Sequence, residues 1–245
     1  MFNLFQIFFK VLFCKEPSFS DDFQKQDFLI LNGISLTLII SFLSCLLAIF
    51  IGFPIGIYLY FLKKNNNHKT YFIINFIINF IISIPFLLLI IFLLKYFIEP
   101  YLKMYSGIKV AIICLSLVLG FIFARHCEQI FLQVNPELYN TAYTLGANKK
   151  QFIIFFLLRE SLPYLVLKLN TIFVSALSYT SVLSFVGVKS IFFIAYTYGY
   201  EGNLSFHKQG FHYKNIIWVC IVILVFIVQI FNLITNFIAK KLDKS

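Results

Sequence analysis

The 245-residue sequence is poor in charge: Lys, Arg, Asp and Glu make up 12% of it, about half the share of an ordinary soluble domain. Apolar and aromatic residues make up 60%, and the mean hydropathy is +0.89. This composition excludes a water-soluble globular domain. The sequence also lacks a Walker A motif, a G-x-G-x-x-G fingerprint and a nucleophile elbow. It therefore predicts no nucleotide-binding site, no cofactor and no catalytic residue.

The cysteines and histidines form no recognisable disulfide or metal pattern. There is no C-x-x-C pair, and the five cysteines are scattered: Cys14, Cys45, Cys114, Cys127 and Cys220. We predict that they are small apolar fillers. His207 and His212 have no third ligand nearby in the sequence. We therefore expect no metal site.

One run, Arg125-His126-Cys127-Glu128, contains residue types that can bind a metal or catalyse a reaction. Consecutive residues on a helix point in different directions, so these four cannot converge on one ion. The i, i+3 spacing of Arg125 and Glu128 instead predicts an ion pair at the end of a membrane span. His126 is expected to be solvated or packed.

Long runs without charge indicate membrane-spanning helices, which need about 20 apolar residues each. Four runs reach this length, at 28–62, 70–94, 169–188 and 215–239. The run 110–124 is shorter, but Lys109 and Arg125 at its ends can snorkel to the lipid headgroups. We predict an all-α integral membrane protein, a polytopic helical bundle of about five transmembrane helices, at residues 31–62, 71–97, 107–127, 164–188 and 215–239.

Two of these spans carry helix-packing or kink signals. Gly52 and Gly56, four residues apart around Pro54, would let another helix approach closely, and the proline would bend the axis. Ser83-Ile84-Pro85-Phe86 lies near the middle of the second span and predicts another kink.

The first 27 residues differ from the rest of the chain. Residues 1–14 are apolar except for Asn3, Gln6 and Lys10, which share one stripe of a helix that is too short to span a membrane. We predict an interfacial helix followed by a solvated linker at 15–27. A secretory signal is disfavoured because no basic residue precedes the apolar run and no small-x-small cleavage site follows it.

The net charge of +10 comes from basic residues that lie mainly between the predicted spans. They are better interpreted as topology signals than as a nucleic-acid surface. When Lys10, Lys15 and Lys25 are set aside, 11 basic residues lie on the side of the C-terminus and 6 on the other. The bias predicts a multi-pass protein of the cell inner membrane, in contact with lipid, with the N-terminus outside and the C-terminus in the cytoplasm.

The segment 128–163 is too polar to cross the membrane, and its signals predict two short helices. Asn135-Pro136-Glu137 supplies a cap, a proline in the first turn and an acid at the positive end of the helix dipole. Gly146 can end that helix, and Asn148 with Gln151 resembles a capping box for the next one.

The same segment resembles the EAA loop of ABC importer permeases, in which Glu-Ala-Ala is followed by three residues, Gly, and a more distant hydrophobic-x-Leu-Pro. The matching residues are Asn140, Thr141, Ala142, Gly146, Phe156 and Leu158. The resemblance implies a helix that docks on a separate ATPase and transmits its movement. If this resemblance is set aside, the segment is predicted to be an amphipathic helix-turn-helix on the surface.

From about residue 32 to 240 the sequence resembles the permeases of bacterial D-methionine importers. The motifs that carry this likeness are 33–38, 52–56, 83–86, Ala124-Arg125 with Glu128, Gly146-Ala147, Leu162-Pro163, Tyr179 with Ser181, and 196–200. The resemblance implies the type I ABC importer permease fold for residues 28–245, with the coupling loop at 128–163. Residues 1–27 lie outside it.

The resemblance further implies a homodimer that works with two copies of a cytoplasmic ABC ATPase and with a periplasmic methionine-binding protein. The binding protein would dock on the outer loops, at about 95–107 and 189–214. Methionine of either hand would be the substrate, and ATP hydrolysis would take place in the partner chain. The positions that match the translocation path are Tyr179 and Val182. Tyr179 has an equally plausible structural interpretation, as a buried tyrosine whose hydroxyl finds a partner in a neighbouring helix.

The chain departs from the family at several positions. Asn140 stands for the Glu of the loop, Thr141 for its next Ala, and Arg159 for its Pro, although Glu137 lies one turn earlier on the same helix face. The glycine-rich stretch after the fourth span is largely replaced, by 188–192.

These departures keep other interpretations open. The chain can be a permease for another small solute, since the fold does not choose the cargo. It can also be a non-transporting scaffold or a decayed relic. An intramembrane enzyme is disfavoured, because the spans contain no paired acids or His–acid constellation.

Overall fold

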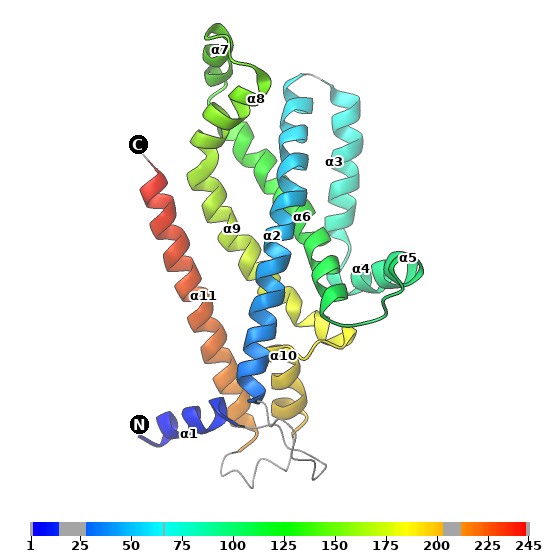
Figure 1. Ribbon diagram of the computed structural model, residues 1–245, viewed down its shortest axis with the longest axis vertical. Helices are drawn as coiled ribbons and strands as arrows, with labels where there is room; N and C mark the ends of the chain where they lie inside the picture. Colours follow the sequence, from blue (N-terminus) through cyan, green and yellow to red (C-terminus); the bar gives the residue numbers. More distant parts are fainter. Residues whose placement is uncertain (1, 15–27, 66, 203–211, 244–245) are drawn as a thin grey trace.

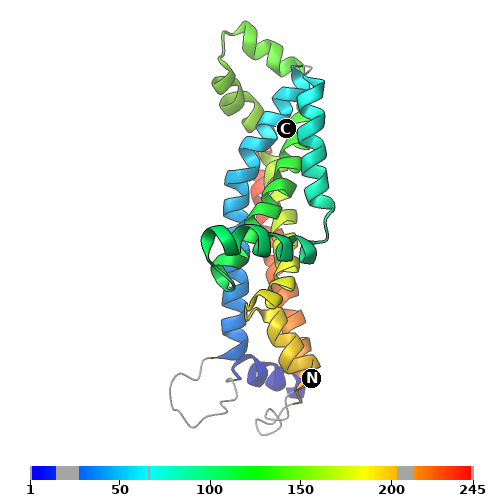
Figure 2. The same ribbon diagram turned by 90° about the vertical axis from the view of Figure 1, so that its right-hand side faces the viewer.

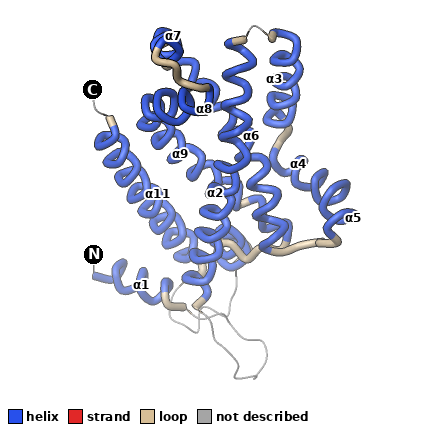
Figure 3. Tube along the Cα trace, turned by 45° about the horizontal axis from the view of Figure 1, so that its top comes forward, coloured by secondary structure: helices blue, strands red, loops and turns tan. Residues whose placement is uncertain are grey.

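The computed structural model describes residues 2–14, 28–65, 67–202 and 212–243, and the regular elements in these ranges are helices (Figures 1 and 3). The predicted linker 15–27 and His207 lie outside them. The four long helices are α2 (Leu29–Lys64), α6 (Ile108–Gln133), α9 (Leu158–Thr180) and α11 (Lys214–Leu242). The shorter elements are α1 (Phe2–Leu12), α3 (His68–Ser83), α4 (Phe86–Leu93), η1 (Leu94–Ile98), α5 (Glu99–Leu102), α7 (Glu137–Thr144), α8 (Lys149–Gln151), η2 (Phe152–Leu157), η3 (Val182–Val186), α10 (Ile191–Ile194) and η4 (Ala195–Tyr200).

The contact between α2 and α6 is the most extensive in the bundle. A stripe of small residues three or four apart runs along α2 and is buried: Gly33, Thr37, Ser41, Ser44, Ala48, Gly52 and Gly56. A Cβ atom on Gly52 would collide with the carbonyl oxygen of Gly120, and one on Gly56 would collide with Cys127 Cβ. The predicted close approach at this glycine pair is confirmed. Toward the start of α2 the same stripe faces α10, where Gly33 lies against Ile191 and Ile194.

The second predicted span is broken rather than merely kinked. α3 and the segment from Phe86 to Leu102 meet at 104°. The break falls at Ile84, which is extended (φ −72°, ψ 129°) because it precedes Pro85. The bend that the motif predicts is confirmed, but its size gives the α4–α5 arm a course across the bundle instead of along it (Figures 1 and 2).

Three helices are long and apolar enough to cross a membrane, namely α2, α6 and α11, and the bent pair from α3 to α5 would make a fourth. α9 is the least apolar of the long helices and carries Arg159, Glu160 and Lys168. It nevertheless packs along α2, α6 and α11. Four of the five expected spans thus correspond to three apolar helices and one broken pair, and the fifth corresponds to the less apolar helix α9.

Two helix ends differ from the expected ones. The third predicted span ends at 127, whereas α6 continues to Gln133. The fourth ends at 188, whereas α9 stops at Thr180 and is followed by the 3-10 turn η3, which ends at Gly187 (φ 80°). Charge and hydropathy report membrane exposure rather than helix geometry, so the predicted span ends do not coincide with the helix ends.

α1 lies across the end of the bundle at which α2 begins (Figure 2). Val11 is fully buried in a cluster with Ile216 and Val219 of α11, while Phe9 and Phe13 are exposed. α1 therefore presents apolar side chains both to the bundle and to its surroundings, as an interfacial helix requires. The two chain ends lie at opposite ends of the bundle, because α11 runs from the α1 end toward α7 (Figure 1).

Candidate functional site

The first helix of the polar segment begins as the sequence predicts. Asn135 Oδ1 accepts a hydrogen bond from the Glu137 N–H at 2.9 Å, and Pro136 precedes the first residue of α7. The side chain of Glu137 is exposed in the first turn, where the helix dipole favours an acid. The cap predicted at Asn135-Pro136-Glu137 is confirmed.

A Schellman motif ends α7 at Gly146. Gly146 has a φ of 73°, its N–H donates to the Tyr143 carbonyl at 3.0 Å, and the Ala147 N–H donates to the Ala142 carbonyl at 3.0 Å. Two residues later the Asn148 N–H donates to Gln151 Oε1 at 2.8 Å, the reciprocal bond of a capping box. The predicted stop and restart are both confirmed, and they give the chain a tight reversal.

The second predicted short helix is not separate. α8, η2 and α9 follow one another without interruption from Lys149 to Thr180. The π-helical turn η2 lies between α8 and α9. The expected boundary at 163 therefore falls inside α9, and Pro163 is tolerated within it. A displacement of α7 would pass directly into a helix that runs through the bundle.

Ala142 anchors α7 on η2. Its side chain is 1% exposed and lines a small cavity of about 190 Å³ with Tyr139 and Phe152. The rings of Tyr139 and Phe152 pack edge to face, with their centroids 5.0 Å apart. A small residue is needed here because α7 and η2 approach each other closely.

The remaining motif residues divide between surface and core. Asn140, Thr141 and Gly146 are exposed, whereas Phe156 and Leu158 are half-buried. The structure thus places the six predicted residues in one module, with a polar face turned outward. Their role in docking stays a prediction.

Two apolar side chains at the tip of this module were missed by the motif. Tyr143 is 75% exposed and Leu145 is 71% exposed. Large apolar side chains exposed on a polar helix end are typical of a contact surface. The available signal was their place between Ala142 and Gly146, where a solvated helix would carry polar residues.

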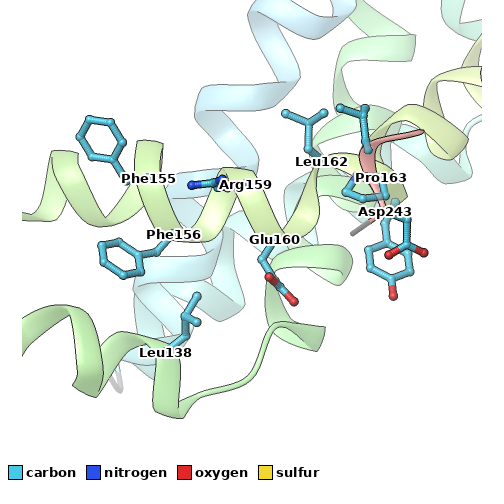
Figure 4. A pocket seen from close by; sticks show the side chains of 10 residues that line it. Leu138, Phe155, Phe156, Arg159, Glu160, Leu162, Pro163 and Asp243 are labelled. Atoms are coloured by element: carbon cyan, nitrogen blue, oxygen red, sulfur yellow. The ribbon is translucent and has the colours of Figure 1, made fainter. Parts of the chain in front are cut away.

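A groove of about 710 Å³ continues from α7 to the end of α11 (Figure 4). Leu138 of α7 faces Phe156 and Glu160 across it, and Asp243 lies at its far end. Arg159, which stands where the family has proline, is exposed and also lines the groove. The C-terminal end of the chain therefore borders the same module as α7.

A charged cluster ties α3 to α6 nearby. Glu128 is 1% exposed; Arg125 Nη1 donates to its Oε2 at 2.5 Å, and the Tyr71 hydroxyl donates to its Oε1 at 2.6 Å. The predicted ion pair of Arg125 and Glu128 is confirmed, but it lies inside α6 rather than at its end. The role of Tyr71 could not be predicted from the sequence, because the contact joins residues 57 positions apart.

The two predicted path residues lie at the other end of α9. The Tyr179 ring stacks on Phe86, with centroids 4.3 Å apart, and Val182 opens η3 partly buried against the core. Tyr179 thus meets the Pro85-Phe86 break of the second span. Among the described residues its hydroxyl has no hydrogen-bond partner, in contrast to the structural interpretation of a paired buried tyrosine.

The stretch that replaces the family's glycines is packed into the bundle. Val188, Ser190 and Ile191 are each at most 2% exposed. The Ile191 N–H donates to Thr37 Oγ1 at 2.9 Å, and Ser190 Oγ accepts from the Phe193 N–H. The replacement therefore builds a capped helix, α10, that is bonded to α2.

Residues 52–245 match the sequence family described as binding-protein-dependent transport system inner membrane component. The probable D-methionine transport system permease protein MetI of Haemophilus influenzae is 31% identical over 210 residues, which cover 84% of this chain and 94% of that protein. A protein of the same description from Pasteurella multocida is 29% identical over 214 residues, which cover 84% and 92%.

Solved structures show the same architecture. A chain of the MetNI methionine ABC transporter in an inward-facing conformation superposes with a TM-score of 0.79 at 26% identity, over 88% of this chain and 97% of that one. A chain of an amino acid ABC transporter crystallised with histidines gives a TM-score of 0.65 at 15% identity, over 87% and 94%. The second likeness concerns the fold alone.

Proposed function

Because the chain belongs to the family of binding-protein-dependent transport system inner membrane components, we propose that it carries methionine, in the L or D form, across the cytoplasmic membrane. It is a multi-pass inner-membrane permease subunit of an ABC importer with the type I fold, and it is not an enzyme. The choice of methionine is supported by the two relatives described as D-methionine permeases and by the likeness to a methionine ABC transporter.

The working assembly is a homodimer with two copies of a cytoplasmic ABC ATPase, and a periplasmic methionine-binding protein delivers the substrate. This arrangement is supported by the likeness to a chain of the MetNI transporter. The outer loops at 95–107 and 189–214 receive the binding protein. The N-terminus lies outside and the C-terminus in the cytoplasm, as the basic residues indicate.

One observation carries the mechanism: α7 presents an exposed face and is joined by the four residues 145–148 to a helix that continues as α9. The ATPase docks on Asn140, Thr141 and the exposed tip at Tyr143 and Leu145. When the ATPases close, α7 moves and the continuous helix carries the displacement into the bundle. Access to the substrate path then alternates between the two sides of the membrane.

Tyr179 and Val182 line the path in this proposal. The unpaired Tyr179 hydroxyl and its stacked ring offer a passing amino acid one polar and one apolar contact. The stack with Phe86 also links the path to the break in the second span. A shift of α9 would therefore change the position of the α4–α5 arm.

The experiment is uptake of labelled methionine into proteoliposomes that contain this chain, its ATPase and its binding protein, with and without internal ATP. ATP-dependent accumulation that only methionine competes away is expected. Accumulation that another amino acid competes away would keep the permease and change the cargo. ATPase binding without uptake of any solute would indicate a relic, consistent with the loss of the loop's glutamate at Asn140.

A further inference from the structure

Lys64, the last residue of α2, lies among three aromatic rings. Its Nζ is 3.5 Å from the ring centroid of Tyr139, 5.7 Å from that of Phe152 and 5.8 Å from that of Tyr60. A cation within about 6 Å of a ring centroid is attracted by the negative face of the ring. The two ion pairs found in the described part of the chain do not include Lys64. The aromatic faces are therefore its partners there.

The rings themselves are fixed by the core. Phe152 is 2% exposed and Tyr60 is 7% exposed. Phe152 packs against Phe61 of α2, and Tyr60 packs against Phe131 of α6, with centroids 6.4 Å and 6.1 Å apart. Tyr139 is the member that belongs to α7, and it packs on Phe152. The Lys64 ammonium thus lies where α2, α7 and η2 meet.

The backbone links α7 to α6 on one side and to α9 on the other, but not to α2. One direct contact between α2 and α7 at this point is the ammonium of Lys64 on the ring of Tyr139. This contact is in the first turn of α7, one residue from Asn140 on the proposed docking face. A movement of α7 would reach the glycine-rich contact of α2 with α6 through it.

We propose that Lys64 is a positioning residue that couples α7 to α2 through its cation–π contact with Tyr139, so that ATPase closure moves α2 together with α9. The inference rests on the proposed function, because it names one contact through which the movement of the ATPase would reach the bundle. The cation is essential, because an apolar side chain of equal length would keep the packing but lose the attraction to the ring face. An arginine at this position would retain the attraction to the ring face.

The chain offers a matched control in Lys63. Lys63 also lies in the last turn of α2 and carries the same charge. Removing that charge would therefore affect the membrane orientation as much as removing the charge of Lys64. Its side chain is exposed, and its Nζ lies 5.8 Å from the ring of Tyr71 on α3, away from α7. A K63M variant therefore removes a charge at the same place without breaking the proposed contact.

The first test measures ATP hydrolysed and methionine transported in the same proteoliposomes for wild type, K64M, K64R, Y139F and K63M. K64M is expected to lower the methionine transported per ATP by about three- to tenfold while ATP hydrolysis continues. K64R, Y139F and K63M should stay near wild type, since the first two keep the cation and the ring. Equal effects of K64M and K63M would overturn the proposal, as would a parallel loss of hydrolysis and transport in K64M.

The second test needs neither ATPase nor substrate. Amide hydrogen exchange of the detergent-solubilised permease is expected to be faster across 137–147 in K64M than in K63M. Unchanged exchange there would overturn the contact between α2 and α7. Absence of uptake by the wild-type transporter would instead refute the proposed function, and the exchange comparison would still decide the contact.

Discussion

Gly52 shows at the scale of one residue how closely α2 and α6 approach. A methyl group there would meet the backbone of Gly120 and Ala124, which cannot rotate away. We predict that G52A lowers the free energy of unfolding by about 1–3 kcal/mol, as overpacking does. Thermal unfolding in detergent measures the loss.

G120A is the matched control for this prediction. A Cβ on Gly120 would come 3.1 Å from Ile51 Cγ2, a side-chain atom that can shift. It should therefore destabilise less than G52A. Equal melting temperatures for G52A and wild type would mean that the two helices have more room than the structure gives them.

Tyr71 is the residue that links α3 to the buried carboxylate of Glu128. We predict that Y71F lowers the free energy of unfolding by about 1–2 kcal/mol, because a hydrogen bond to a charged group is lost while Arg125 still pairs with the acid. The measurement is again thermal unfolding. Y58F, on an exposed tyrosine of α2, should leave the melting temperature unchanged; a similar loss in both variants would contradict the prediction.

At the scale of the element, α7 depends on its Schellman turn. Gly146 has a left-handed φ of 73°, which an alanine adopts at a cost of about 1 kcal/mol or more. We predict that G146A frays the end of α7 and weakens binding of the ATPase subunit about fivefold. Titration of detergent-solubilised permease with labelled ATPase measures this affinity.

G107A is the control for G146A. Gly107 has a φ of 104°, and nothing lies within 4 Å of a Cβ built on it, as for Gly146. Gly107 directly precedes the first residue of α6, and α7 follows the other end of that helix. The variant carries at least as much backbone strain, but away from α7, so it should bind ATPase normally. Equal weakening by both variants would show a general loss of folding.

The elements also show which features of the fold the sequence pattern predicts and which it does not. The caps of α7 at Asn135 and Gly146 are local hydrogen-bond motifs, so the sequence predicts them well. The break at Pro85 is local too, but the direction of the arm beyond it is not, since α4 and Phe86 turn to meet Tyr179 of a helix far along the chain.

At the scale of the whole molecule, the orientation in the membrane stays a prediction from the basic residues. Lys63, Lys64, Lys149 and Lys150 lie at the same end of the bundle as the end of α11, which borders the groove beside α7. We predict that a green fluorescent protein fused to the C-terminus fluoresces, because it stays in the cytoplasm. A C-terminal alkaline phosphatase fusion should be inactive, and activity there would reverse the proposed topology.

The sequence by itself determined the membrane character, the helical class and the need for a separate ATPase chain, because these depend on composition and on motifs that are present or absent. It also located the Arg125–Glu128 pair, the glycine contact and the caps of α7, which all follow from spacings of a few residues. Only the tertiary structure decided that α8 and α9 form one helix, that Tyr71 reaches Glu128, and that Lys64 rests on Tyr139. The two contacts join segments distant in sequence, and their geometry depends on how the whole bundle packs.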